Sequence, residues 1–205
     1  MTVKKDYFNG KSASDKDIIH LYMLNTCTHK CKLCCNKLYS VDDIPVVTVE
    51  ELKQANTICL TGGEPFLIDN ICDFAGDIKS QYPNIKQVYV YTCGDSLWHW
   101  LEHHAHGALQ NIDGVNISPK NKYDVECVRK IFNNPNYRED ILRLWSSRIY
   151  VFPNVRFLEF DHEVFSWPKM LRLDGYESIK IIDREWQEDF EPESGIFRRL
   201  PILFN

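Results

Sequence analysis

The sequence lacks any apolar run that approaches the roughly 20 residues a membrane helix needs. Its first residues, 1–6, also lack the apolar core of a secretory signal peptide, so we expect a cytoplasmic protein with no membrane partner. Positive charge is not in excess either. The net charge is −5, and a nucleic-acid partner is therefore not expected.

Internal repeats, low-complexity tracts and linkers are also missing from the 205 residues. A chain of this length has room for one domain with a sizeable core. We therefore predict a single domain over residues 1–205. Its core runs from about 18 to 183, between a polar N-terminal start and a C-terminal extension.

Cysteine, by contrast, is plentiful. Eight cysteines without a secretion signal favour metal ligands or free thiols over disulfides. Four of them fall within nine residues, and there is no second C-x2-C pair to suggest another cluster domain. Among the scattered ones, Cys59 and Cys72 lie between apolar residues, which is typical of buried packing thiols.

Cys27, Cys31 and Cys34 form the spacing C-x3-C-x2-C. Three thiolates suit an iron–sulfur cluster, and they leave one iron of a four-iron cluster open for a substrate or cofactor. Cys35 could compete as a ligand. Zinc usually takes paired C-x2-C knuckles or mixed Cys and His sets, so a zinc loop is the alternative interpretation.

Short, nearly continuous apolar runs alternate with helical patterns along the chain. The runs predict buried parallel strands at 18–24, 57–61, 86–92, 114–118 and 178–183, and the segments 148–152 and 155–160 are candidates for a further strand. Helices are predicted from Thr48, at 65–82, 97–106, 123–132 and 136–145, with a capping box from Thr48 to Glu51 and with Asp95 or Ser96 capping the third. Residues 184–205 receive no assignment.

This alternation is the βαβ pattern of a parallel sheet, with five or six strands in an α/β fold. The cysteine loop follows the first strand, and Gly62-Gly63-Glu64 follows the second. Sites in such folds gather at the carboxyl ends of the strands. The two glycines remove side chains where backbone must approach a ligand, and Glu64 offers an acceptor for a cationic amine. The alternative is an ordinary strand-to-helix turn.

The C-x3-C-x2-C spacing and the segment Leu60 to Pro65, which resembles a GGE(P) sequence, together resemble the signature of the radical S-adenosylmethionine (radical SAM) superfamily. The resemblance implies an open partial (β/α)6 barrel with a mainly parallel sheet. It implies a [4Fe-4S] cluster on Cys27, Cys31 and Cys34, with SAM on the fourth iron. Reductive cleavage of SAM would yield a 5′-deoxyadenosyl radical that abstracts hydrogen from a substrate, the chemistry of an oxidoreductase or lyase. The electron donor would be a flavodoxin or ferredoxin.

Further site residues follow from the same resemblance. Leu33 stands where the superfamily often has an aromatic, so its backbone rather than a ring would touch adenine. Strand alternation places Asn116 and Ser118 on one face, as polar strand-end contacts. The implied cofactor-binding residues are Leu33, Gly62, Gly63, Glu64, Thr92, Asn116 and Ser118, with Lys120 toward the substrate.

Two subgroups share short features with the chain. Thr28-His29-Lys30-Cys31 resembles a motif of glycyl-radical activating enzymes, whose substrate is a protein. Ser118-Pro119-Lys120 resembles 7-carboxy-7-deazaguanine synthase-like enzymes, whose substrate is a small molecule, and we favour that class. Cys35-Asn36 stands where those enzymes have Asp-Thr, which departs from their magnesium site. A non-catalytic iron–sulfur or zinc-binding protein is the alternative of another class.

His99 to His103 reads H-x-x-E-H, the inverted zinc-protease pattern. On a helix the two histidines would share a face. The apolar residues between and beside them favour a packing helix instead.

Overall fold

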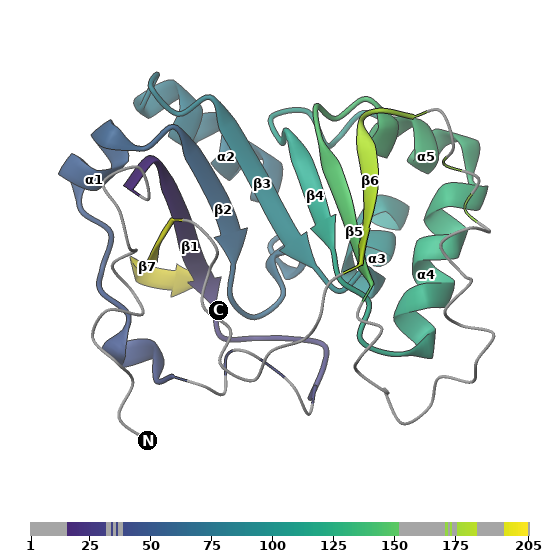
Figure 1. Cartoon of the computed structure of the whole chain (residues 1–205), viewed down its shortest axis with the longest axis horizontal. Coiled ribbons are helices and arrows are strands. Elements are labelled where there is room, and N and C mark those ends of the chain that lie inside the picture. The colour runs from purple at the N-terminus through teal and green to yellow at the C-terminus, as the bar shows by residue number, and fades with distance from the viewer. Residues whose placement is uncertain are drawn as a thin grey trace.

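The computed structural model describes residues 16–31, 34, 36, 39–151, 171, 173, 176–183 and 195–204. Within them the chain forms one seven-stranded sheet in the order β6-β5-β4-β3-β2-β1-β7 (Figure 1). The strands are β1 (Ile18–Leu24), β2 (Thr57–Thr61), β3 (Gln87–Thr92), β4 (Gly114–Ile117), β5 (Ser147–Val151), β6 (Ile179–Asp183) and β7 (Ile196–Phe204).

Every pairing between these strands is parallel. Among the described residues β6 and β7 form the two edges, so the sheet is not closed. The predicted α/β class and open partial barrel are confirmed. The sheet has seven strands where five or six are predicted, and the additional strand is β7, which occupies part of the segment left unassigned. The strand predicted at 155–160 lies outside the described residues.

The helices are α1 (Val49–Gln54), α2 (Ile71–Gln81), α3 (Asp95–His103), α4 (Lys122–Asn133) and α5 (Pro135–Leu142). The capping box of α1 is present, with Glu51 N donating to Thr48 Oγ1 and Thr48 N donating to Glu51 Oε2. No helix in the described part of the chain is long and apolar enough to cross a membrane.

Two helix starts differ from prediction. Pro65 begins a single 3-10 turn (Pro65–Leu67), which ends where Ile68 N donates to Pro65 O. The polar residues 69–70 follow, and α2 starts only after Asn70. Asp95 is the first residue of α3 and not its cap. Gly94, with φ of 109°, takes the cap position and turns the chain sharply out of β3.

The main core lies between the sheet and its helices. Val90, Val115, Ile117 and Ile149 are fully buried there, and α2 and α3 lie behind the sheet in the view of Figure 1. Because successive side chains alternate along a strand, Asn116 belongs to the other face. The helix side of the sheet therefore forms the hydrophobic core that stabilises the fold. The other face and the carboxyl ends of the strands are the places where a functional site can lie.

Candidate functional site

Loops after four neighbouring strands meet at the carboxyl ends of the strands, which we call the site edge of the sheet. Cys27 follows β1, Gly62 and Gly63 follow β2, Cys93 follows β3 and Ser118 follows β4. Because the strands are parallel and adjacent, their carboxyl ends lie together (Figure 1). The candidate residues were predicted from the sequence to lie here, after the carboxyl ends of the strands.

The three thiols of the motif lie within electrostatic range of one another. The pKa of Cys31 is raised to about 11, mainly by partial burial, and the charges of Cys34 and Cys27 add to the rise. The pKa of Cys27 is raised by burial of its thiol, although the residue as a whole is exposed, and Cys34 contributes there too. Such thiols keep their protons at neutral pH unless a bound metal displaces them. Leu33 and Cys35 lie outside the described residues.

The Gly62-Gly63 turn is fixed against the start of the cysteine loop. Both glycines have positive φ, 80° and 49°. A Cβ at Gly62 would overlap the ring of Tyr22, and one at Gly63 would overlap the carbonyl oxygen of Thr26. Glu64 N also donates to Thr26 O at 2.9 Å. The glycines therefore allow two stretches of this chain to touch, and a role in ligand approach stays a prediction.

Glu64 turns its carboxylate into the protein. The residue is 2% exposed, and its Oε2 accepts from Cys93 N at 3.0 Å and from Cys93 Sγ at 2.9 Å. Its Oε1 accepts from Phe66 N at 3.3 Å. Burial raises the pKa of Glu64, against the hydrogen bonds from Cys93. The predicted acceptor for a cationic amine thus already has partners within the chain, and its charge also reaches Cys27.

The other predicted polar residues lie along β3, β4 and the loop after them. Thr92 is buried, and its carbonyl accepts from Ser118 N at 2.8 Å. Lys120 Nζ donates to Ser118 Oγ at 2.6 Å, and its positive charge lowers the pKa of Cys31. Lys120 is therefore placed near the cysteine motif. Asn116 is buried within β4, on the face away from the main core.

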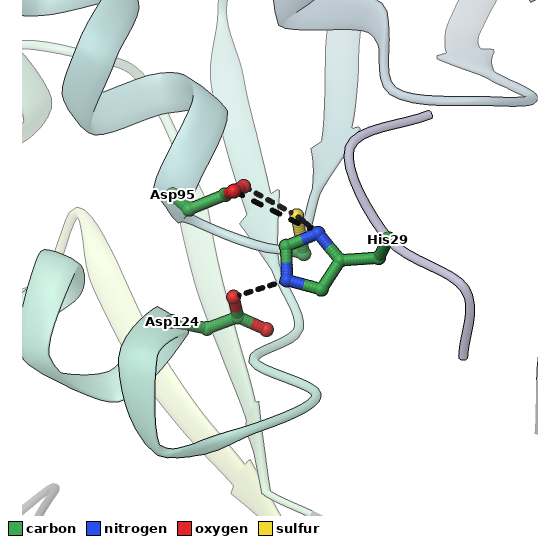
Figure 2. A group of neighbouring side chains, drawn as sticks. His29, Asp95 and Asp124 are labelled. Atoms are coloured by element: carbon green, nitrogen blue, oxygen red, sulfur yellow. Dashed lines mark hydrogen bonds and ion pairs between the residues drawn. The ribbon is translucent and has the colours of Figure 1, made fainter. Parts of the chain in front are cut away.

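Sequence reasoning missed a second group at the same edge, shown in Figure 2. The imidazole of His29 lies between Asp124 and Asp95. Its Nε2 is 2.7 Å from Asp124 Oδ1, and its Nδ1 is 3.7 Å from both Asp95 Oδ2 and Cys93 Sγ. The pKa of His29 is raised, chiefly by its contact with Asp124.

A positional signal for this group was present in the sequence. Cys93 and Asp95 follow β3 directly, and Asp124 lies in the first turn of the helix after β4. The sequence alone assigns His29 no specific role, and Cys93 is one of the cysteines outside the C-x3-C-x2-C motif. Their convergence depends on contacts between separate loops, which no local pattern encodes.

The H-x-x-E-H segment forms the packing helix that was expected. Trp100 and Leu101 are buried, whereas His99 pairs with Glu102 on the exposed side of α3. His103 Nδ1 contacts the carbonyl of His99 at 2.7 Å. Among the described residues, the side chains that converge on a possible metal position are those of the His29 group instead.

The fold and this edge define an open, parallel α/β protein with its polar groups gathered at the strand ends. No protein-family model matches the sequence, and no curated protein matches it. Among solved structures, the chain is similar to BtrN in its complex with AdoMet and 2-DOIA, with a TM-score of 0.37 and 15% identity over 82% of this chain. The match covers 56% of the BtrN chain. A likeness this distant carries no argument about function.

Proposed function

We propose that the protein is a radical SAM enzyme, with Cys27, Cys31 and Cys34 as the ligands of a [4Fe-4S] cluster. The observation that carries the proposal is the C-x3-C-x2-C loop after β1, with its base held against the Gly62-Gly63 turn after β2 by the bond from Glu64 N to Thr26 O. When bound, the cluster and SAM would supply the 5′-deoxyadenosyl radical for hydrogen abstraction from the substrate.

The donor set fits a cluster better than a single zinc ion. Zinc–thiolate bonds are about 2.3 Å long, so two thiolates on one zinc lie at most about 4.6 Å apart. In the described part of the chain, the three cysteines are not among the side chains close enough to share one ion. The C-x3-C-x2-C set also lacks the paired C-x2-C or the mixed Cys and His ligands that a structural zinc ion usually takes.

Residues of this chain would hold and tune such a cluster. His29 N lies 3.4 Å from Cys27 Sγ and can donate to it. Hydrogen bonds to the sulfurs and nearby charges set the reduction potential of a cluster. Lys120, whose charge acts on Cys31, would offset part of the negative charge of the thiolates. The contact of Gly63 with Thr26 fixes the base of the loop.

A small-molecule substrate is the finer part of the proposal. Tyr91 pairs in register with Asn116, Asn116 with Arg148, and Arg148 with Lys180, across β3 to β6. Residues in register on parallel strands point to the same face, here the one opposite the main core. This row combines an aromatic ring, an amide and two positive charges, which suits a small anionic substrate. A flavodoxin or ferredoxin would supply the electron.

Anaerobic reconstitution with iron and sulfide tests the ligand set. The chain should become brown and bind about four irons. Replacing Cys27, Cys31 or Cys34 singly with Ala should abolish the iron–sulfur absorption. Cys72→Ala is the matched control, because Cys72 is buried in α2 as part of the main core, and it should keep the cluster. Stable binding of zinc with no uptake of iron would contradict the proposal.

A further inference from the structure

The group formed by His29, Cys93, Asp95 and Asp124 contains nitrogen, sulfur and oxygen donors from three separate segments. One candidate ligand atom from each of the four lies within 4.8 Å of the others. His29 comes from the cysteine loop, Cys93 and Asp95 from the junction of β3 and α3, and Asp124 from the first turn of α4. Figure 2 shows the imidazole enclosed between the two carboxylates.

The charges here do not balance among the side chains in contact. Glu64, Asp95 and Asp124 are each at most 5% exposed, and His29 supplies at most one positive charge to set against the three carboxylates. Burying carboxylates without matching positive charge or protons is costly. Backbone N–H groups at the starts of α3 and α4 offset part of this charge, because Ser96 N donates to Asp95, and Lys120 N and Asn121 N donate to Asp124. A bound cation would offset the rest.

At two atoms, Cys93 Sγ and Asp124 Oδ1, the hydrogen bonding depends on how few protons this group holds. Cys93 Sγ carries one proton but lies 2.9 Å from both Glu64 Oε2 and Asp95 Oδ1, so it can donate to only one of them at a time. Asp124 Oδ1 is buried and lies 2.7 Å from His29 Nε2, so it accepts a hydrogen bond there only when that ring nitrogen carries a proton. A metal ion would resolve both: it would displace the thiol proton, and it would fix a proton on Nε2 facing Asp124.

We propose that His29 Nδ1, Cys93 Sγ and the Asp95 carboxylate bind one divalent, zinc-like metal ion, with Asp124 holding the other ring nitrogen of His29. Ligands at about 2.0–2.3 Å from a tetrahedral zinc ion lie roughly 3.3–3.6 Å from one another. The observed separations from Nδ1 are 3.7 Å to Cys93 Sγ and 3.7 Å to Asp95 Oδ2. Nδ1 also lies 2.7 Å from Thr28 Oγ1, so the metal ion would replace that hydroxyl as the partner of Nδ1 while small side-chain movements bring the ligands to zinc-binding distance.

The chemistry of the donors supports this class of ion. Mixed imidazole, thiolate and carboxylate sets suit zinc and similar transition metals better than magnesium or calcium, which prefer oxygen alone. Metal-bound histidines usually donate their second ring N–H to a carboxylate, which is the position of Asp124. Three protein ligands leave the fourth position to water.

Such an ion would join the cysteine loop to the start of α3. It goes beyond the radical SAM proposal, because Cys27, Cys31 and Cys34 are not among its ligands. The two sites would share the cysteine loop, since His29 lies between Cys27 and Cys31. The competing account is a protonated His29 paired with Asp124 and Asp95 in the absence of metal.

Cobalt titration distinguishes these accounts. The full-length chain with Cys27, Cys31 and Cys34 replaced by Ser would be titrated anaerobically with Co²⁺. One equivalent should give a thiolate-to-cobalt charge-transfer band and the visible bands of a four-coordinate site. Adding Cys93→Ser should remove the charge-transfer band. Adding Asp124→Asn should weaken cobalt affinity by about 10- to 100-fold.

His103→Asn is the matched control, because His103 lies on the exposed side of α3, and it should leave the titration unchanged. If the triple-serine chain does not fold by circular dichroism, zinc stoichiometry of the otherwise wild-type chain decides. Cys93→Ser should then lower it by one equivalent. Absence of a charge-transfer band in the folded chain, a band that survives Cys93→Ser, or an unchanged zinc stoichiometry would each overturn the proposal.

Discussion

At the scale of single residues, Gly63 connects the two motifs of the site. Its φ of 49° disfavours side chains, and the space where a Cβ would stand holds the carbonyl oxygen of Thr26. Thr26 directly precedes Cys27, so a shift there moves the first cysteine of the motif. Gly63 is therefore required both for backbone conformation and for the position of the cysteine loop.

We expect Gly63→Ala to destabilise the chain by more than the conformational cost alone and to impair loading of the cluster. A non-glycine residue in the left-handed region costs about 1–2 kcal/mol, and here the clash with Thr26 adds to it. Gly107→Ala isolates the first effect, because Gly107 has φ of 85° with open space around its Cα. Denaturant unfolding and iron content measure both variants. Equal losses of stability, with full iron uptake in both, would contradict this role of Gly63.

The candidate site was predictable from sequence only where local spacing encodes it. The three cysteines and the Gly-Gly-Glu turn were found because each motif is contiguous and follows a strand. The interaction of Glu64 with Cys93 and the approach of Asp124 to His29 join segments far apart in sequence. Nothing in the local sequence around Cys93 distinguishes it from a cysteine that only packs in the core.

At the scale of elements, α1 and β7 are joined by one ion pair. Arg198 donates to Glu51 Oε1 from Nε at 2.8 Å and from Nη2 at 2.7 Å. Burial opposes ionisation of Glu51, but the hydrogen bonds from Arg198 and Thr48 outweigh it and lower the pKa of Glu51. The same glutamate completes the capping box of α1, so it stabilises the helix and fixes its place against β7.

Glu51→Gln should lower the free energy of unfolding at neutral pH by about 1.5–3 kcal/mol, the range for hydrogen bonds to charged groups. Because the folded-state pKa lies below the ordinary 4.5, the stabilisation is present above pH 4.5. It is lost as the pH falls through the folded-state pKa. The difference from wild type should therefore shrink in acid.

Unfolding curves measured from neutral to acidic pH check this expectation. Glu50→Gln is the control, because Glu50 is exposed on the same helix and should have little effect at any pH. A Glu51→Gln difference that stays constant down to strongly acidic pH would argue against the ion pair as its cause.

At the scale of the whole molecule, the parallel sheet followed from the alternation of apolar runs with helical patterns. β1, β2 and β3 agree with prediction to within a residue because buried parallel strands are continuous apolar segments. β7 escaped prediction because Arg198, Arg199 and Pro201 interrupt its apolar residues, and because only its first three residues are buried at this edge of the sheet. Its place beside β1 is a long-range pairing that only the folded sheet reveals.

The parallel sheet connects the hydrophobic core, the strand β7 and the loops of the candidate site. The helices bury one side of the sheet, β7 supports β1, and β1 leads directly into the cysteine loop. The other loops of the candidate site follow β2, β3 and β4, the next strands along the sheet. The proposed chemistry therefore depends on a continuous parallel sheet, and loss of the strand order would separate the two motifs.

Reductive cleavage of SAM tests the central proposal most directly. The reconstituted chain would be reduced with dithionite in the presence of SAM, and 5′-deoxyadenosine and methionine would be quantified. We predict that both form with the wild-type chain and with Cys72→Ala, and that neither forms with Cys31→Ala. A chain that holds a reducible [4Fe-4S] cluster yet releases no 5′-deoxyadenosine, or an active Cys31→Ala variant, would contradict the proposal.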